Sequence, residues 1–218
     1  MDSLRSGTRA ANPEQRIFAY TMSRDVAADQ LGVLPRRRNP VLRALGRLYL
    51  RSSGWRIRGR VPPEPKFVAI VAPHTSNWDF VVCVAAMFTL DLRIQWFGKD
   101  TLFRWPLGWL LRALGGLPVR RDSAKGVVSE IADSIRAQPR FILALAPEGT
   151  RRHVDEWRTG FYHIADRAGV PILPVALDWG EREIEIGDPV RTAGDPASEI
   201  PRLRARYRIE MALRPEGF

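Results

Sequence analysis

Apolar runs alternate with amphipathic stretches along most of this chain. Residues 67–72 form a continuous apolar run of strand length, and an amphipathic segment at 78–89 follows it. A helical pattern at 124–138 likewise precedes an apolar run at 140–146. Alternation of strands and helices is typical of α/β proteins whose sheet is largely parallel. We therefore expect an α/β fold with one layer of largely parallel, mixed sheet covered by helices.

The remaining pattern completes this expectation. Further strands are predicted at 57–60, 92–97, 117–119, 171–178 and 182–186, and helices at 40–50, 105–114, 158–168 and 197–213. The short strands at 57–60 and 182–186 are typical of sheet edges. Residues 1–39 are polar and lack periodicity, which predicts a disordered tail or a loosely attached helix. The folded part is then one domain over residues 40–218, a length that suits a single core.

Charge narrows the class of partner. The 218 residues include 34 Lys and Arg against 24 Asp and Glu, a formal net charge of +10. Such a balance favours anionic partners such as phosphorylated molecules, acidic lipid surfaces or nucleic acid, although a basic solvated surface is an equal alternative. Cys83 is the only cysteine, so no internal disulfide can form. The chain has neither a secretory leader pattern nor an apolar stretch of ~18 residues, so we expect a cytoplasmic protein.

Candidate chemistry follows the apolar run at 67–72. Pro73 has no N–H for a sheet ladder, so the strand should end there and expose His74 at its carboxyl end. In open α/β sheets this is where ligands bind. Asp79 can reach His74 if the imidazole lies in the turn and the carboxylate in the first helical turn, which makes a general-base pair. Ser76 and Asp79 also fit a capping box, so a purely structural carboxylate is the alternative.

A second apolar run ends in the same way. The run at 140–146 is followed by Pro147, and then by Glu148, Gly149, Thr150 and Arg151. Glycine lets a backbone approach a ligand closely, and a guanidinium grips phosphate through two parallel hydrogen bonds. If both strands end at one edge of one sheet, the general base and the residues that bind an anion lie in one cleft. That pairing favours group transfer to the hydroxyl of a phosphorylated acceptor.

Four motifs in order resemble the glycerolipid acyltransferase family, the lysophosphatidic acid acyltransferase-like enzymes. The first is the His-x4-Asp pair at 74–79, and the second is a Gly-rich turn at 115–121 that ends in Arg121. The third is Glu-Gly-Thr-Arg at 148–151, and the fourth is Val-Pro-Ile-x-Pro-Val at 170–175. The resemblance covers about residues 55 to 180. One such motif alone would be weak, whereas four in sequence are specific.

The resemblance implies transfer of an acyl group from acyl-CoA or acyl carrier protein to a lysophospholipid, foremost 1-acylglycerol-3-phosphate, in phospholipid biosynthesis. His74 and Asp79 would be catalytic. Glu148, Gly149, Thr150, Arg151 and Arg121 would hold the acceptor phosphate. It implies no metal and no cofactor, because a thioester is already an activated donor. Another lysolipid, such as an amino-acid-containing one, is an alternative acceptor.

Two segments are candidates for contact with an anionic membrane at the inner face of the cell membrane. The helix at 40–50 carries apolar positions 41, 42, 45, 48 and 49 beside several arginines, although a helix that covers the sheet has the same pattern. Trp105 and Trp109 suit a membrane interface, and core packing explains them equally. A non-catalytic basic module is a different class of function, but no motif for nucleic acid is present and we expect no nucleic-acid partner. A hydrolase that releases the acyl group to water is a third class, but this sequence lacks the Gly-x-Ser-x-Gly motif that carries the nucleophilic serine in such enzymes.

Overall fold

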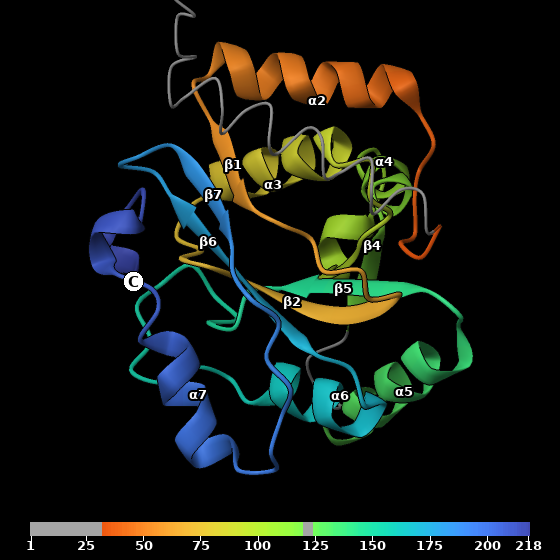
Figure 1. Ribbon diagram of the computed structural model, residues 1–218, viewed down its shortest axis with the longest axis vertical. Coiled ribbons are helices and arrows are strands. Elements are labelled where there is room, and N and C mark those ends of the chain that lie inside the picture. The colour runs from red at the N-terminus through yellow and green to blue at the C-terminus, as the bar shows by residue number, and fades with distance from the viewer. Residues whose placement is uncertain (1–31, 120–123) are drawn as a thin grey trace, which may run out of the picture.

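The computed structural model describes residues 32–119 and 124–218, and its centre is a mixed sheet (Figure 1). Within those ranges seven strands lie in the order β1-β7-β6-β2-β5-β3-β4. They are β1 (Arg56–Gly59), β2 (Lys66–Ala72), β3 (Gln95–Lys99), β4 (Gly116–Val119), β5 (Phe141–Leu145), β6 (Ile172–Asp178) and β7 (Glu183–Ile186). Every neighbouring pair is parallel except β6 and β7. The predicted largely parallel, mixed sheet is confirmed.

Helices cover both faces of this sheet. They are α2 (Pro40–Ser52), α3 (Asn77–Thr89), α4 (Gly108–Ala113), α5 (Ala124–Ala137), α6 (Gly160–Ala168) and α7 (Pro196–Arg204), with 3-10 turns η1 (Asp100–Phe103), η3 (Ile209–Met211) and η4 (Pro215–Gly217). In Figure 1, α2 and α3 lie on one side of the sheet, and α5, α6 and α7 lie on the other. Because both faces are covered, the central strands β2, β5 and β6 are apolar except for Lys66 and Asp178 at their ends.

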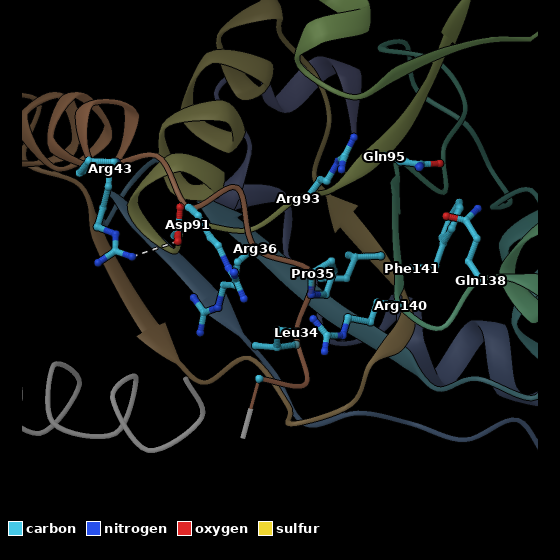
Figure 2. A pocket seen from close by; sticks show the side chains of 14 residues that line it. Leu34, Pro35, Arg36, Arg43, Asp91, Arg93, Gln95, Gln138, Arg140 and Phe141 are labelled. Atoms are coloured by element: carbon cyan, nitrogen blue, oxygen red, sulfur yellow. Dashed lines mark hydrogen bonds and ion pairs between the residues drawn. The ribbon is translucent and has the colours of Figure 1, made fainter. Parts of the chain in front are cut away.

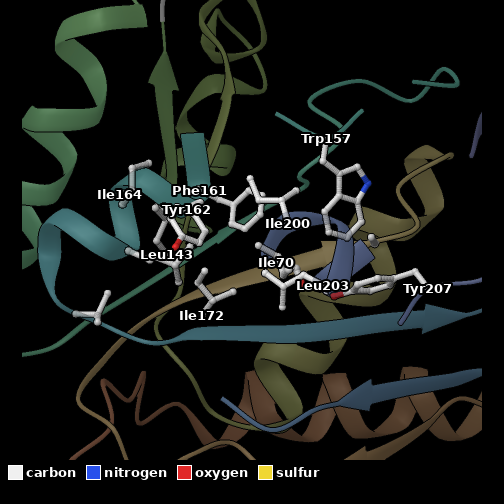
Figure 3. Packing of buried hydrophobic residues seen from close by; sticks show 14 of the residues in the cluster. Ile70, Leu143, Trp157, Phe161, Tyr162, Ile164, Ile172, Ile200, Leu203 and Tyr207 are labelled. Carbon is white, nitrogen blue, oxygen red and sulfur yellow. Dashed lines mark hydrogen bonds between the residues drawn. The ribbon is translucent and has the colours of Figure 1, made fainter. Parts of the chain in front are cut away.

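Strand β2 shows how the two cores are filled. Val68 and Ile70 point into the cluster beneath α6 and α7, which includes Trp157, Phe161 and Tyr207 (Figure 3). Phe67 and Ala69 alternate with them and pack into the core on the α3 side. Successive strand side chains point to opposite faces, so one continuous apolar run supplies both cores. This double burial fixes β2 at the centre and therefore fixes the position of the turn that follows it.

Helix α2 packs on α3 rather than on the sheet. Gly46 makes the contact possible, because a Cβ added there would lie 2.6 Å from the carbonyl oxygen of Ala85. Gly46 and Leu50 are buried, whereas Val41, Leu45 and Leu48 are exposed. The apolar positions predicted to share one face are therefore divided between an inner face on α3 and an outer stripe in solvent.

The domain begins earlier than residue 40. Leu34 is buried in the core on the α3 side, and Arg36 forms an isolated bridge with Leu92. The Arg37 guanidinium donates to the carbonyl oxygens of Ala113 and Leu114 at 3.1 and 3.0 Å. The prediction of a tail over 1–39 is wrong for residues 32–39. This segment packs into the core and donates hydrogen bonds to carbonyl oxygens at the end of α4, so it is part of the domain. The rest of the predicted tail, 1–31, lies outside the described residues.

The place of one strand and the boundaries of two elements also differ from prediction. Strand β7 was expected at an edge but lies between β1 and β6, because β1 adds to it in parallel. The strand expected from residue 92 begins at Gln95. The final helix, expected to reach residue 213, ends at Arg204, and the chain then turns through η3 and η4.

Candidate active site

The turn at 73–76 connects the centre of the sheet to α3. Strand β2 ends at Ala72, as the following proline predicts. Helix α3 begins at Asn77, with Ser76 as its N-cap and Asp79 as the reciprocal partner in a capping box. The turn is thus held at both ends, by a buried strand and by a capped helix. His74 lies between these two anchors.

Asp79 is fully buried and makes three polar contacts through its two oxygens. Oδ2 accepts the backbone N–H of Ser76 at 2.7 Å and lies 3.3 Å from Nδ1 of His74. Oδ1 accepts Nε1–H of Trp179 at 2.8 Å. The structural and the catalytic interpretations of Asp79 are therefore compatible, because one carboxylate caps α3 and contacts the imidazole.

The contact with Asp79 orients the His74 ring. A carboxylate accepts only, so this 3.3 Å ion-pair contact favours the tautomer with its hydrogen on Nδ1, which leaves Nε2 as the proton acceptor. The His74 side chain is 29% exposed, whereas that of Asp79 is 1% exposed. The acceptor nitrogen therefore belongs to a side chain that reaches solvent, and its partner carboxylate does not. This is the arrangement that a general base requires.

Glu148 lies beside His74 because β5 neighbours β2. The two strands run parallel with Ile70 opposite Leu145, so the chain leaves both at the same edge. Oε1 of Glu148 accepts the backbone N–H of His74 at 3.1 Å. Glu148 is only 3% exposed, and its Oε2 accepts no hydrogen bond within the described residues. Burial raises the pKa of this carboxyl; its hydrogen bonds lower it, and the nearby Asp79 charge raises it further.

The predicted phosphate-binding residues are placed differently from one another. Glu148 is buried against the His74 turn, and a carboxylate there would repel a phosphate. Gly149 has a left-handed φ of 65°, Thr150 is half-buried, and Arg151 is exposed. The Arg151 guanidinium makes no ion pair within the ranges that the structure covers. Arg121 lies outside the described residues.

Three partners of this site had no clear signal in the sequence. Trp179, just after β6, binds Asp79 across 100 positions of sequence. Arg158 lies over the Gly149 turn, since a Cβ added at Gly149 would be 2.7 Å from its Cδ and Nε. The backbone N–H of Arg214 donates to Oγ1 of Thr75 at 3.2 Å. Only the positive charge of Arg158 could have suggested a role beside an anion.

Other candidate groups lie apart from this chemistry. His163 is exposed on α6. Cys83 is half-buried on α3 against the core cluster that includes Leu50 of α2, and burial raises its thiol pKa to about 12, with the Asp79 charge as a smaller cause. A thiol with such a pKa is not a nucleophile at neutral pH. Across 32–119 and 124–218, the structure gathers no set of three or more His, Cys, Asp or Glu side chains suited to a metal ion.

Comparison with known proteins assigns the family. Residues 56–178, more than half of the chain, match the Acyltransferase family. The chain belongs to the acyltransferase family. The match begins at β1 and ends with β6, so it includes both the His74–Asp79 turn and the Glu148–Arg151 turn.

Individual relatives of this acyltransferase are distant. The 1-acyl-sn-glycerol-3-phosphate acyltransferase of Haemophilus influenzae is 28% identical, over 76% of each chain. The human 1-acyl-sn-glycerol-3-phosphate acyltransferase alpha is 26% identical over 75% of this chain and 64% of its own length. A lyso-ornithine lipid O-acyltransferase of Rhodobacter capsulatus is 34% identical, but over only 43% of this chain and 32% of its own.

A solved structure supports the fold of the acyltransferase. The crystal structure of the 1-acyl-sn-glycerophosphate acyltransferase PlsC from Thermotoga maritima superposes with a TM-score of 0.53. It covers 85% of this chain and 82% of its own at 18% sequence identity, so the likeness concerns the fold. Among the described helices of this acyltransferase, none has both the length and the apolarity to cross a membrane.

Proposed function

We propose that this acyltransferase transfers a fatty acyl group from a thioester to the free hydroxyl of 1-acylglycerol-3-phosphate. The observation that carries the proposal is the pair of His74 and Asp79, joined at 3.3 Å and held beside the Glu148–Arg151 turn. The pair supplies a base with a fixed tautomer. Relatives named 1-acyl-sn-glycerol-3-phosphate acyltransferases support this acceptor.

The reaction needs one proton acceptor that later becomes a donor. Nε2 of His74 takes the proton of the acceptor hydroxyl while its oxygen attacks the thioester carbonyl carbon. The C–S bond then breaks, and the imidazolium returns the proton to the leaving thiolate. Asp79 stabilises the imidazolium between these steps and stays ionised itself. Protons and electron pairs balance, and the chain forms no covalent bond to the acyl group.

The acceptor phosphate is assigned to the turn that follows β5. The exposed Arg151 guanidinium offers the paired N–H groups that suit phosphate oxygens, and Arg158 lies against the same turn. Gly149 and Thr150 shape the backbone between them. We assign Glu148 a different task, because its carboxylate accepts the His74 N–H and lies out of solvent. It is a positioning residue for the catalytic turn.

Acyl-CoA or acyl carrier protein is the proposed donor, since both present the acyl chain as a thioester. An activated donor removes the requirement for a metal or a redox cofactor in this chemistry. A second acceptor class, an amino-acid-containing lysolipid, is favoured by one observation, the 34% identity to the lyso-ornithine lipid O-acyltransferase. Assays with both acceptors in parallel separate the two.

We further propose that the enzyme works on the inner face of the cell membrane as a peripheral protein. Val41, Leu45 and Leu48 form an exposed apolar stripe on α2. Trp105, between η1 and α4, is 91% exposed, and Trp109, in α4, is 69% exposed, which rules out the alternative that they fill the core. Exposed tryptophans and an apolar helix stripe beside arginines suit the boundary between lipid headgroups and chains.

Labelled acyl transfer to lysophosphatidic acid tests the proposal. We expect His74→Ala to lower kcat by about 10² to 10⁴, the usual contribution of a general base, while the protein stays folded. His163→Ala, which removes an exposed imidazole from α6, is the matched control and should retain full activity. Equal turnover by His74→Ala and the control would refute the catalytic role. Release of free fatty acid in place of the diacyl product would indicate a hydrolase.

The phosphate assignment has its own test. Arg151→Ala should raise KM for lysophosphatidic acid about ten- to hundredfold, as expected when one charge-assisted contact is lost. With an unphosphorylated monoacylglycerol acceptor the same variant should behave like the parent enzyme. Arg202→Ala on α7 removes an exposed arginine elsewhere and serves as control. An unchanged KM for lysophosphatidic acid would remove Arg151 from the phosphate site.

A further inference from the structure

A large cavity lies at the edge of the sheet that faces away from His74. Its volume is about 730 Å³, and its walls include the starts of β3 and β5 at Gln95 and Phe141. His74 follows the opposite end of β2, and a strand of seven residues spans about 20 Å. The cavity is therefore separate from the catalytic turn. Its size is ordinary for a small-molecule site.

The charge of this cavity is strongly one-sided. Five arginines line it together with one carboxylate: Arg36, Arg38, Arg43, Arg93, Arg140 and Asp91 (Figure 2). They come from the segment before α2, from α2 itself and from the loops that lead into β3 and β5. Residues distant in sequence are thus gathered at one place by the order of the strands.

The single carboxylate does not neutralise this charge. Asp91 is buried, and its Oδ2 pairs with the Arg43 guanidinium at 3.0 Å. Its Oδ1 accepts the backbone N–H of Asn39 at 3.3 Å. Both oxygens of Asp91 therefore already bind groups of the protein at the cavity wall. What remains is a positively charged wall.

Three of the remaining arginines, Arg38, Arg93 and Arg140, are exposed. Arg93 and Arg140 make no hydrogen bond or ion pair through their side chains within the ranges that the structure covers, and both are exposed. Arg36 is used differently, since it donates to the carbonyl oxygen of Leu90 at 2.6 Å. Burial lowers the pKa of the neighbouring Arg37, the charge of Arg93 lowers it further, and the charge of Asp91 raises it. Like charges that line one concave site favour binding of an anion there.

We propose that this cavity binds a phosphate-bearing anion at a site distinct from the active site. Arg93 and Arg140 would grip the phosphate oxygens, because the planar guanidinium matches them in two-point geometry. Gln95 and Gln138 also line the cavity and offer amide hydrogens to the same ligand, and the second N–H of the Gln138 amide donates to the carbonyl oxygen of Ser134 at 3.4 Å. The ligand is either the headgroup of an anionic phospholipid or a soluble phosphorylated molecule.

The position of α2 bears on the source of the phosphate. Pro40 and Arg43 belong both to the cavity wall and to the first turns of α2. The exposed apolar stripe begins directly after Pro40, at Val41. A lipid held by its headgroup in the cavity would therefore lie beside the face of α2 that suits lipid chains. A soluble phosphate compound needs only the cavity.

Binding by the full-length chain tests the site in two arms. One arm is co-flotation with vesicles of phosphatidylcholine that contain phosphatidylglycerol, and the other is calorimetric titration with inorganic pyrophosphate. The test variant is Arg93→Gln with Arg140→Gln. The matched control is Arg202→Gln with Arg206→Gln, which removes the same charge from exposed positions on and just after α7, on the other side of the sheet.

We expect the test variant to bind at least about tenfold more weakly in one or both arms, while the control stays within about twofold of the parent. Loss in the vesicle arm alone identifies a lipid headgroup, and loss with pyrophosphate identifies a soluble source. If the test variant and the control bind alike in both arms, the site does not exist. Turnover on detergent-dispersed acceptor should be unchanged in the test variant. Binding is measured without catalysis, so failure of the acyl-transfer proposal would leave this result intact.

Discussion

Replacing Asp79 by asparagine tests the central claim that one buried carboxylate both caps α3 and directs His74. The carboxylate accepts from Ser76 and Trp179 and contacts Nδ1 of His74, whereas an amide can accept at only one of its two ends. In Asp79→Asn, the amide N–H groups of the new side chain must face either the Ser76 and His74 donors or the Trp179 donor. Either orientation sets N–H against N–H inside the protein.

The size of the effect follows from these contacts. A weakened N-terminal cap costs ~1 kcal/mol, and a buried donor left without an acceptor costs ~1–3 kcal/mol. We therefore expect a loss of about 2–4 kcal/mol in the free energy of unfolding. The loss in kcat should be about 10²- to 10⁴-fold, because the imidazole loses the group that fixes its tautomer and stabilises its charged form. KM should change little, since Asp79 is buried and cannot touch the acceptor.

The assay pairs urea unfolding with initial rates of acyl transfer, corrected for the folded fraction. Asp178→Asn is the matched control: Asp178 is also buried, at the end of β6, and its Oδ1 accepts the Glu181 N–H at 2.9 Å. It does not contact His74. The control should keep its kcat. If folded Asp79→Asn retained kcat within about threefold of the parent, the carboxylate would be a helix cap alone and the base would need another partner.

Two further predictions concern the buried acid and the exposed aromatics. Because burial raises the folded-state pKa of Glu148, the stability contributed by its protonated form is full below its ordinary pKa and is lost as pH rises through the raised value. Glu148→Gln should therefore gain stability relative to the parent in urea unfolding as pH rises above the ordinary carboxyl pKa. The exposed Glu130→Gln should not, and parallel pH profiles of the two variants would contradict this. Trp105→Ser with Trp109→Ser should weaken vesicle binding about tenfold or more, and exposed Ile209→Ser should not. Equal binding by all three proteins would exclude the aromatic segment from the membrane contact.

The local geometry of the turn that carries His74 was readable from sequence because the interactions that form it are local. An apolar run before Pro73 ends a strand, and Ser76 with Asp79 starts a helix a few residues later. Steric limits and capping hydrogen bonds act over a few residues, so the pattern alone predicts them. The same holds for the run that ends at Pro147. The alternation of these elements also predicted the α/β class.

What only the tertiary structure decided is which distant segments meet. The adjacency of β2 and β5 sets the Glu148 carboxylate on the His74 backbone, and the end of β6 brings Trp179 to Asp79. The packing of α2 on α3 through Gly46 turned one predicted apolar face into two, and strand order gathered the arginines at the far edge of the sheet. Periodicity reports that a side chain will be buried but not against what. Partners far apart in sequence are chosen by how all the strands and helices pack together.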